Sequence, residues 1–143
     1  MDASIIRVDL TKQSHKVEKI GEEVLRKYIG GRGLGVRILY DELKPKTDPL
    51  KPENKLIFMT GPLIGTYVPT AGRFHVITKS PLTGSIGDSN CGGDWGPELR
   101  FAGYEGVVIE GKSPRPVYLW IHDGSVEFKS AAKLWGKGVW QTE

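Results

Sequence analysis

Apolar and polar residues alternate along two neighbouring stretches near the start of the chain, 4–10 and 14–20, which are joined by the polar turn TKQS. A period of two is typical of a strand with one buried face, so this pair predicts a β-hairpin. The same pattern predicts further strands, and a turn at 122–125 makes the last two a second hairpin. These strands span 55–59, 73–79, 105–110, 117–121 and 126–129.

Three segments carry helical signals. Residues 22–28 begin with two glutamates, and in 36–43 apolar residues recur at helical spacing until Pro45 ends the pattern. Residues 96–102 predict a short helix with Pro97 near its first position. The sequence GRGLG at 31–35 lacks the G-x-G-x-x-G spacing, so we interpret it as a tight turn between helices rather than a dinucleotide fingerprint.

Together these elements predict an α+β fold, a β-rich single domain of two sheets and a few short helices. A pair of glycines precedes a helix twice, at Gly30-Gly31 and at Gly92-Gly93, each time after a β-rich stretch. This arrangement is compatible with an internal pseudo-repeat but does not establish one.

A glycine-rich segment, 81–95, is the most unusual part of the chain, and its composition predicts a loop rather than a strand or helix. Asn90 offers an amide to a ligand, and Gly92 allows backbone N–H groups to approach one without a Cβ in the way. Arg73, beside Gly72 at the edge of the preceding strand, offers a planar fork of donors. From these residues alone, a ligand platform and a purely structural loop are equally well supported.

Composition narrows the choice of function. The 143 residues suffice for one domain, and the net charge of +3 is scattered without any basic run, which argues against nucleic acid. The absence of a long apolar run predicts no membrane span and no signal peptide, so we expect a cytoplasmic protein. A single cysteine excludes an internal disulfide and a four-cysteine metal or iron–sulfur site within this chain.

The titratable residues form no catalytic pattern in the sequence. His15, His75 and His122 lie far apart and show no metal-ligand spacing. Cys91 and His75 could lie close together in the fold and form a nucleophile–base pair. No third group that would orient the histidine is identifiable, so nucleophilic catalysis is disfavoured. We therefore assign no catalytic and no metal-binding residue to this chain.

Several long motifs are similar to the N-terminal domain of the tungsten-containing aldehyde ferredoxin oxidoreductases, and the resemblance spans essentially the whole chain. The motifs are KYIGGRGLGVRILYDEL (27–43), PENKLIFMTGPLIGT (52–66), GRFHVITKSPLTG (72–84), SNCGGDWGPELRFAGYEGVVIEGK (89–112), PVYLWI (116–121) and LWGKGVWQTE (134–143). Cys91 departs from the family pattern, which carries serine at this position.

The resemblance implies an enzyme that oxidises aldehydes to carboxylic acids and passes electrons to ferredoxin through a [4Fe-4S] cluster. Its tungsten, or molybdenum in some relatives, is held by two pterins, and residues 1–143 would form the metallopterin-binding N-terminal domain. By motif, the pterin contacts fall on Arg73, Asn90 and Gly92. The cluster ligands would lie outside this chain, in C-terminal helical domains that also complete the site.

The resemblance also implies that this chain is a fragment of a longer one and is inactive alone. The apolar residues Trp135, Val139 and Trp140 near the end of the sequence agree with a helix that continues. Exposed apolar surface at that end, or on the pterin-facing sheet, predicts self-association into a homo-oligomer. The alternative is a stand-alone, non-catalytic binding or assembly module with the same fold.

Overall fold

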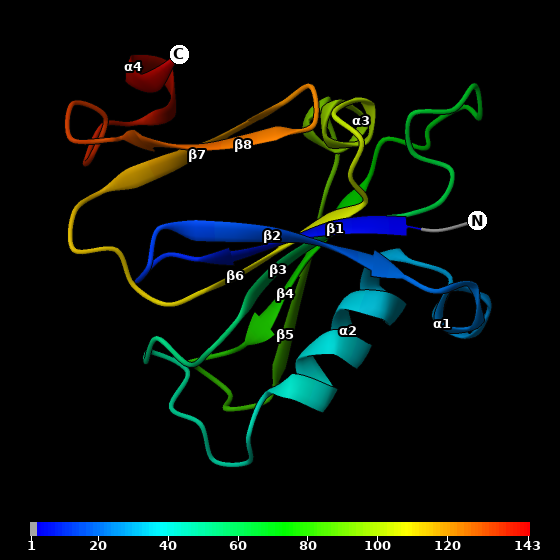
Figure 1. Ribbon diagram of the computed structural model, residues 1–143, viewed down its shortest axis with the longest axis horizontal. Helices are drawn as coiled ribbons and strands as arrows, with labels where there is room; N and C mark the ends of the chain where they lie inside the picture. Colours follow the sequence, from blue (N-terminus) through cyan, green and yellow to red (C-terminus); the bar gives the residue numbers. More distant parts are fainter. Residues whose placement is uncertain (1–2) are drawn as a thin grey trace.

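The computed structural model describes residues 3–143 and contains two β-sheets and four helices, of which α2 is the longest (Figure 1). The larger sheet comprises β1 (Ala3–Asp9), β2 (Ser14–Ile20), β3 (Leu56–Thr60), β4 (Phe74–Lys79), β5 (Ile86–Cys91) and β6 (Gly106–Glu110). The smaller sheet is the hairpin of β7 (Val117–His122) and β8 (Ser125–Ser130). The helices are α1 (Glu22–Tyr28), α2 (Gly31–Glu42), α3 (Trp95–Phe101) and α4 (Val139–Thr142). The predicted α+β class with two sheets is confirmed.

The six strands of the larger sheet lie in the order β2-β1-β6-β3-β4-β5. The pair β1–β6 is parallel and every other neighbouring pair is antiparallel, so the sheet is mixed. The consecutive strands β3, β4 and β5 form a meander that ends at the sheet edge. Strand β5 is therefore an edge strand, with one side of its backbone unpaired.

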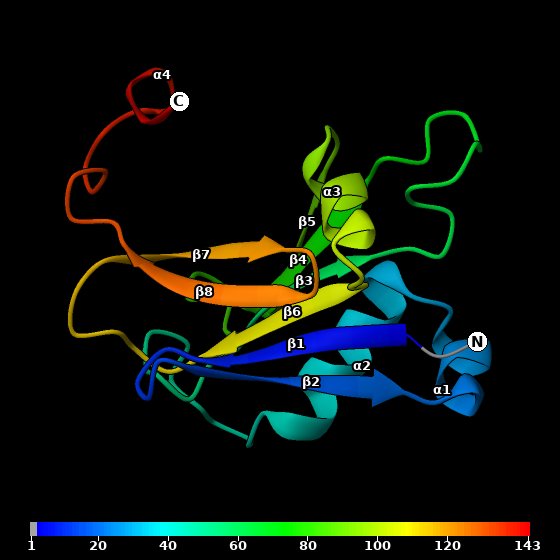
Figure 2. The same cartoon turned by 45° about the horizontal axis from the view of Figure 1, so that its top comes forward.

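The two faces of the larger sheet are covered by different elements, as the two views in Figures 1 and 2 show. Helix α2 lies across one face, where its buried residues pack on apolar side chains of the strands. That cluster contains Ala3, Ile5, Ile20, Leu34, Ile38, Leu39, Ile57, Met59, Ile77 and Val108. Helix α3 and the β7–β8 hairpin cover the other face, whose core contains Ile6, Val8, Leu99, Tyr104, Val107 and Val126. Strand alternation accounts for the division, because Ile5 and Ile6 are neighbours that face opposite cores.

Two local predictions were wrong. Residues 86–91 form strand β5 inside the segment that was expected to be a loop. This strand exists because its whole length pairs in register with β4, from Phe74↔Cys91 to Lys79↔Ile86. Tertiary pairing thus overrides a composition of glycine, aspartate, serine and asparagine that disfavours strands.

The second error concerns the glycines at 31–35, which lie inside the first turns of α2 rather than in a turn between helices. A Cβ at Gly35 would lie 2.5 Å from Cδ1 of Ile77, and one at Gly33 would lie 2.7 Å from the carbonyl oxygen of Tyr28. These glycines therefore allow α2 to approach the sheet and the end of α1. The link between the helices is a γ-turn at Ile29 (φ 65°), closed by the Gly30 N–H donating to the Tyr28 carbonyl at 2.8 Å.

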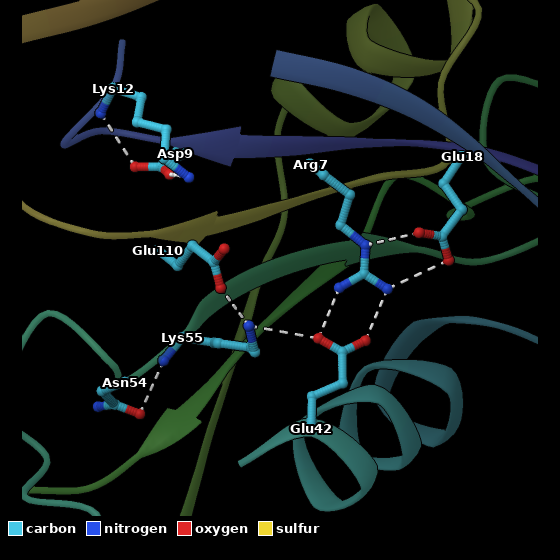
Figure 3. A network of polar contacts seen from close by, with 8 residues as sticks. All are labelled: Arg7, Asp9, Lys12, Glu18, Glu42, Asn54, Lys55 and Glu110. Atoms are coloured by element: carbon cyan, nitrogen blue, oxygen red, sulfur yellow. Dashed lines mark hydrogen bonds and ion pairs between the residues drawn. The ribbon is translucent and has the colours of Figure 1, made fainter. Parts of the chain in front are cut away.

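An ion-pair network fixes the C-terminal end of α2 to the sheet (Figure 3). The Arg7 guanidinium contacts both carboxylate oxygens of Glu42 at 2.6 and 2.7 Å and both of Glu18 at 3.0 and 3.2 Å. The Lys55 ammonium bridges Glu42, at 3.3 Å, and Glu110. Partial burial raises the pKa of Glu42, but the hydrogen bond and charge of Arg7, helped by Lys55, outweigh it and lower the pKa overall.

Candidate functional site

Strand β4 begins and β5 ends at the same end of the sheet, and the first residues of α2 and α3 lie there too. Gly31 opens α2 beside His75 of β4, since a Cβ on this glycine would lie 3.5 Å from Cδ2 of the imidazole. On the α3 side, a Cβ at Gly72 would lie 3.4 Å from the carbonyl oxygen of Gly93. Residues far apart in the sequence therefore meet around the start of β4.

Arg73 and Asn90, two of the three residues assigned by motif, are brought into direct contact. The Arg73 guanidinium donates a hydrogen bond from Nη1 to Oδ1 of Asn90, and both residues are exposed. Among residues 3–143, Asn90 is the single hydrogen-bond or ion-pair partner of the Arg73 side chain. The remaining guanidinium N–H groups are therefore available to an anionic or polar ligand.

Gly92, the third assigned residue, follows directly after β5 and is exposed. A Cβ at Gly92 would meet no atom within 4 Å, and its φ lies outside the left-handed region. Neither packing nor backbone conformation within the described residues demands glycine here. Its neighbour Gly93 differs, because a φ of +94° requires glycine for the chain to turn toward α3. Gly92 thus leaves open space beside Asn90 that a side chain would occupy.

His75 belongs to the same group of side chains, and its contacts there were not predicted from the sequence. Its Nε2 lies 3.0 Å from Nδ2 of Asn90, and its Nδ1 lies 2.9 Å from Oδ1 of Asp88. The other oxygen of Asp88 lies 3.4 Å from Nη1 of Arg32, in the first turn of α2. The five residues therefore form one continuous row of polar contacts.

The sequence contained a signal for this row. Asp88 and Asn90 are two residues apart, so they share a face as soon as 86–91 is recognised as a strand. His75 is directly opposite Asn90 in the register and joins them on that face. Because the segment was interpreted as a loop, neither the shared face of Asp88 and Asn90 nor the pairing of His75 with Asn90 was predicted.

Cys91 lies on the other face of the strand. It is paired with Phe74, next to His75, and alternation turns adjacent residues to opposite sides. Its thiol is exposed and donates to the carbonyl oxygen of Gly92 at 3.3 Å. A Cys91–His75 catalytic pair is therefore not formed, and the group that orients His75 is Asp88.

Across residues 3–143, no group of three or more histidine, cysteine, aspartate or glutamate side chains is arranged to hold a metal ion. No helix in this range has the length and apolar character needed to cross a bilayer. The site at the end of β4 and β5 contains guanidinium, amide, imidazole and carboxylate groups, together with exposed backbone at Gly92.

The chain is similar to known proteins along almost its whole length. Residues 5–143 match the family described as "Aldehyde ferredoxin oxidoreductase, N-terminal domain". The chain is 55% identical over 139 residues to the tungsten-containing aldehyde ferredoxin oxidoreductase of Pyrococcus abyssi. It is 42% identical over 140 residues to the aliphatic sulfonate oxidoreductase, WOR-like subunit, of Pyrococcus furiosus.

A solved structure is similar as well. The active site complex BamBC of benzoyl coenzyme A reductase, in complex with 1,5-dienoyl-CoA, matches with a TM-score of 0.96 and 40% identity over 99% of this chain. In each comparison the match spans only part of the relative, 23% of the Pyrococcus abyssi protein and 22% of the other two. Because the family match covers residues 5–143, almost the whole of this chain, the chain belongs to the aldehyde ferredoxin oxidoreductase N-terminal domain family.

Proposed function

We propose that residues 1–143 are the metallopterin-binding domain of a longer, cytoplasmic tungsten or molybdenum oxidoreductase. Arg73, Asn90 and Gly92 would contact the pterin and its phosphate. The complete enzyme would oxidise an aldehyde to a carboxylic acid and deliver electrons to ferredoxin through a [4Fe-4S] cluster bound by later domains. The isolated chain would then be inactive, because this proposal places the reacting metal and cluster ligands outside it.

The observation that carries the proposal is the open space at Gly92 beside the Arg73–Asn90 pair. A phosphate matches the free donors of a guanidinium fork, and a pterin ring carries donors and acceptors that an amide can meet. A glycine that the fold does not need leaves room for a ring to approach the backbone. These residues therefore match the ligand in charge and in hydrogen bonding, and Gly92 leaves the neighbouring backbone uncovered.

The range of relatives supports a cofactor role over a substrate role. The similar proteins carry names that refer to aldehydes, to aliphatic sulfonates and to benzoyl coenzyme A. Because these enzymes share the domain but act on such different substrates, the domain is better explained by a cofactor that they have in common than by any one substrate. When bound, the metal with its dithiolene sulfurs would supply the two-electron chemistry, while the protein supplies position and electrostatics.

The test uses the full-length protein that contains this chain, produced in cells supplied with tungstate. We expect tungsten and pterin to copurify with it, and Arg73→Ala to weaken cofactor retention about 10- to 100-fold because it removes charge-assisted hydrogen bonds. Arg115→Ala, at an exposed arginine outside the site, is the matched control and should retain the cofactor. Absence of both tungsten and pterin, or a collapse in thermal stability with unchanged cofactor per folded molecule, would contradict the proposal.

A further inference from the structure

The row of polar contacts at the site has a defined hydrogen-bond direction. A guanidinium is donor-only, so the Asn90 atom that faces Arg73 must be the acceptor Oδ1. The Nδ2 of the same amide then faces His75 Nε2 at 3.0 Å and donates to it. With Nε2 as the acceptor, the imidazole proton lies on Nδ1 and is donated to Asp88 at 2.9 Å. Each group therefore donates to the next, from Arg73 to the carboxylate.

The side chains of His75 and Asp88 are mostly covered by the protein. They are 19% and 23% exposed. The His75 ring lies against the first turn of α2 at Gly31, and Arg32 of the same turn neutralises the charge of Asp88. The imidazole is thus supported by its own strand, by β5 and by α2.

We propose that His75 and Asp88 are positioning residues that act together with Arg73 to hold the Asn90 carboxamide in one of its two orientations for the bound pterin. The inference rests on the proposed function and names the groups that prepare its site. In this orientation Asn90 keeps an unused lone pair on Oδ1 and an unused proton on Nδ2 for the ligand. An amide that is already oriented loses less conformational freedom on binding than one that turns freely.

The direct test is nuclear magnetic resonance of the 143-residue chain labelled with ¹⁵N at histidine. Long-range ¹H–¹⁵N correlations report which ring nitrogen carries the proton, and we expect His75 to be protonated at Nδ1 only. The spectra are recorded at a pH where the ring is neutral, and a proton on Nε2 instead of Nδ1 would leave the Asn90 Nδ2 without its acceptor and overturn the inference. This measurement needs no variant, so it does not depend on whether a substituted chain folds.

Substitutions at Asp88 separate positioning from general stability. Asp88→Asn keeps an acceptor oxygen and should preserve the Nδ1–H form of His75, whereas Asp88→Leu removes the acceptor and should shift the proton toward Nε2. Ser89→Ala changes the same strand at a residue outside the row, so it is the matched control and should not move the tautomer. An Nδ1–H signal that survives Asp88→Leu would show that Asp88 does not orient the ring.

The same variants in the full-length, cofactor-loaded protein link the row to ligand binding. Asp88→Leu should release the pterin about fivefold faster than wild type, because a less firmly oriented Asn90 amide loses about one hydrogen bond to the ligand, and Asp88→Asn should restore most of the retention. If Asp88→Leu retains cofactor like wild type while Arg73→Ala loses it, the positioning role is wrong and the proposed function stands. If neither variant affects cofactor retention, the proposed site itself is wrong.

Discussion

The ion-pair network around Arg7 should contribute measurably to stability, and Arg7→Met tests this. Methionine preserves the apolar stem of the side chain but removes both bidentate contacts, to Glu42 and to Glu18. Breaking a buried pair costs about 3–5 kcal/mol, while an exposed pair is worth about 0.2–1 kcal/mol.

The magnitude follows from where these groups lie between the two limits. The Arg7 side chain is 16% exposed, and the side chains of Glu42 and Glu18 are 31% and 36% exposed. Water can therefore rehydrate the carboxylates in part once the guanidinium is gone. We expect Arg7→Met to lower the free energy of unfolding by about 2 kcal/mol, between those limits.

Urea unfolding of the chain, followed by the fluorescence of its four tryptophans, measures this loss. The matched control is Arg26→Met, which removes the exposed i,i+4 pair with Glu22 and should cost about 0.5 kcal/mol or less. A double-mutant cycle with Glu42→Gln should show a coupling of about 1 kcal/mol or more. If Arg7→Met costs no more than the control, the network does not stabilise the packing of α2 as we argue.

Other predictions concern backbone geometry, acid stability and the cysteine. Gly35→Ala should destabilise the chain by about 1–3 kcal/mol in urea unfolding, and Ile77→Val should recover part of that loss, because the new Cβ would meet the Ile77 δ-methyl at 2.5 Å. Ile29→Gly should stabilise it by about 1 kcal/mol by relieving the positive φ, and a lower urea midpoint would contradict this. The pKa of Glu42 is lower in the folded than in the unfolded state. Its ionised carboxylate therefore stabilises the fold at pH values above the unfolded-state pKa, and this stabilisation is lost as the pH falls through the folded-state pKa. Glu42→Gln should make the free energy of unfolding less dependent on pH in this acidic range. Cys91→Ser should change stability by less than about 0.5 kcal/mol, and a larger change would give the exposed thiol a role that its contacts do not.

The elements with strong periodicity were predicted from the sequence because their signals are local. The β1–β2 hairpin alternates with a period of two, and its strands occupy the predicted residues within one position. Helix α1 has the predicted bounds, with glutamates in its first turn and basic residues in its last. Neither element depends on a distant partner for its pattern.

The two errors, β5 and the start of α2, both depend on distant partners. Of residues 86–91 only Ile86 clearly favours a strand, and the segment forms one because β4 provides a complete partner. The glycines at the start of α2 are poor helix formers. They are needed because a side chain at Gly35 would collide with Ile77 of β4, and one at Gly33 would collide with the carbonyl oxygen of Tyr28 in α1.

The candidate site was predicted in part. The family motifs led to Arg73, Asn90 and Gly92, and the structure brings the first two into contact beside the third. The contacts that join His75 and Asp88 to Asn90 were not predicted, since they exist only in the register of an unrecognised strand. The pterin role of the site, the homo-oligomer and the internal pseudo-repeat stay predictions.

A crystal structure of the full-length protein with its cofactor bound would show whether Arg73, Asn90 and Gly92 form the pterin site. The account predicts a pterin phosphate or ring within about 3.2 Å of the Arg73 guanidinium and the Asn90 carboxamide, with the ring or phosphate in the space beside Gly92. A metallopterin bound elsewhere, with Arg73 and Asn90 facing solvent or another protein segment, would contradict it.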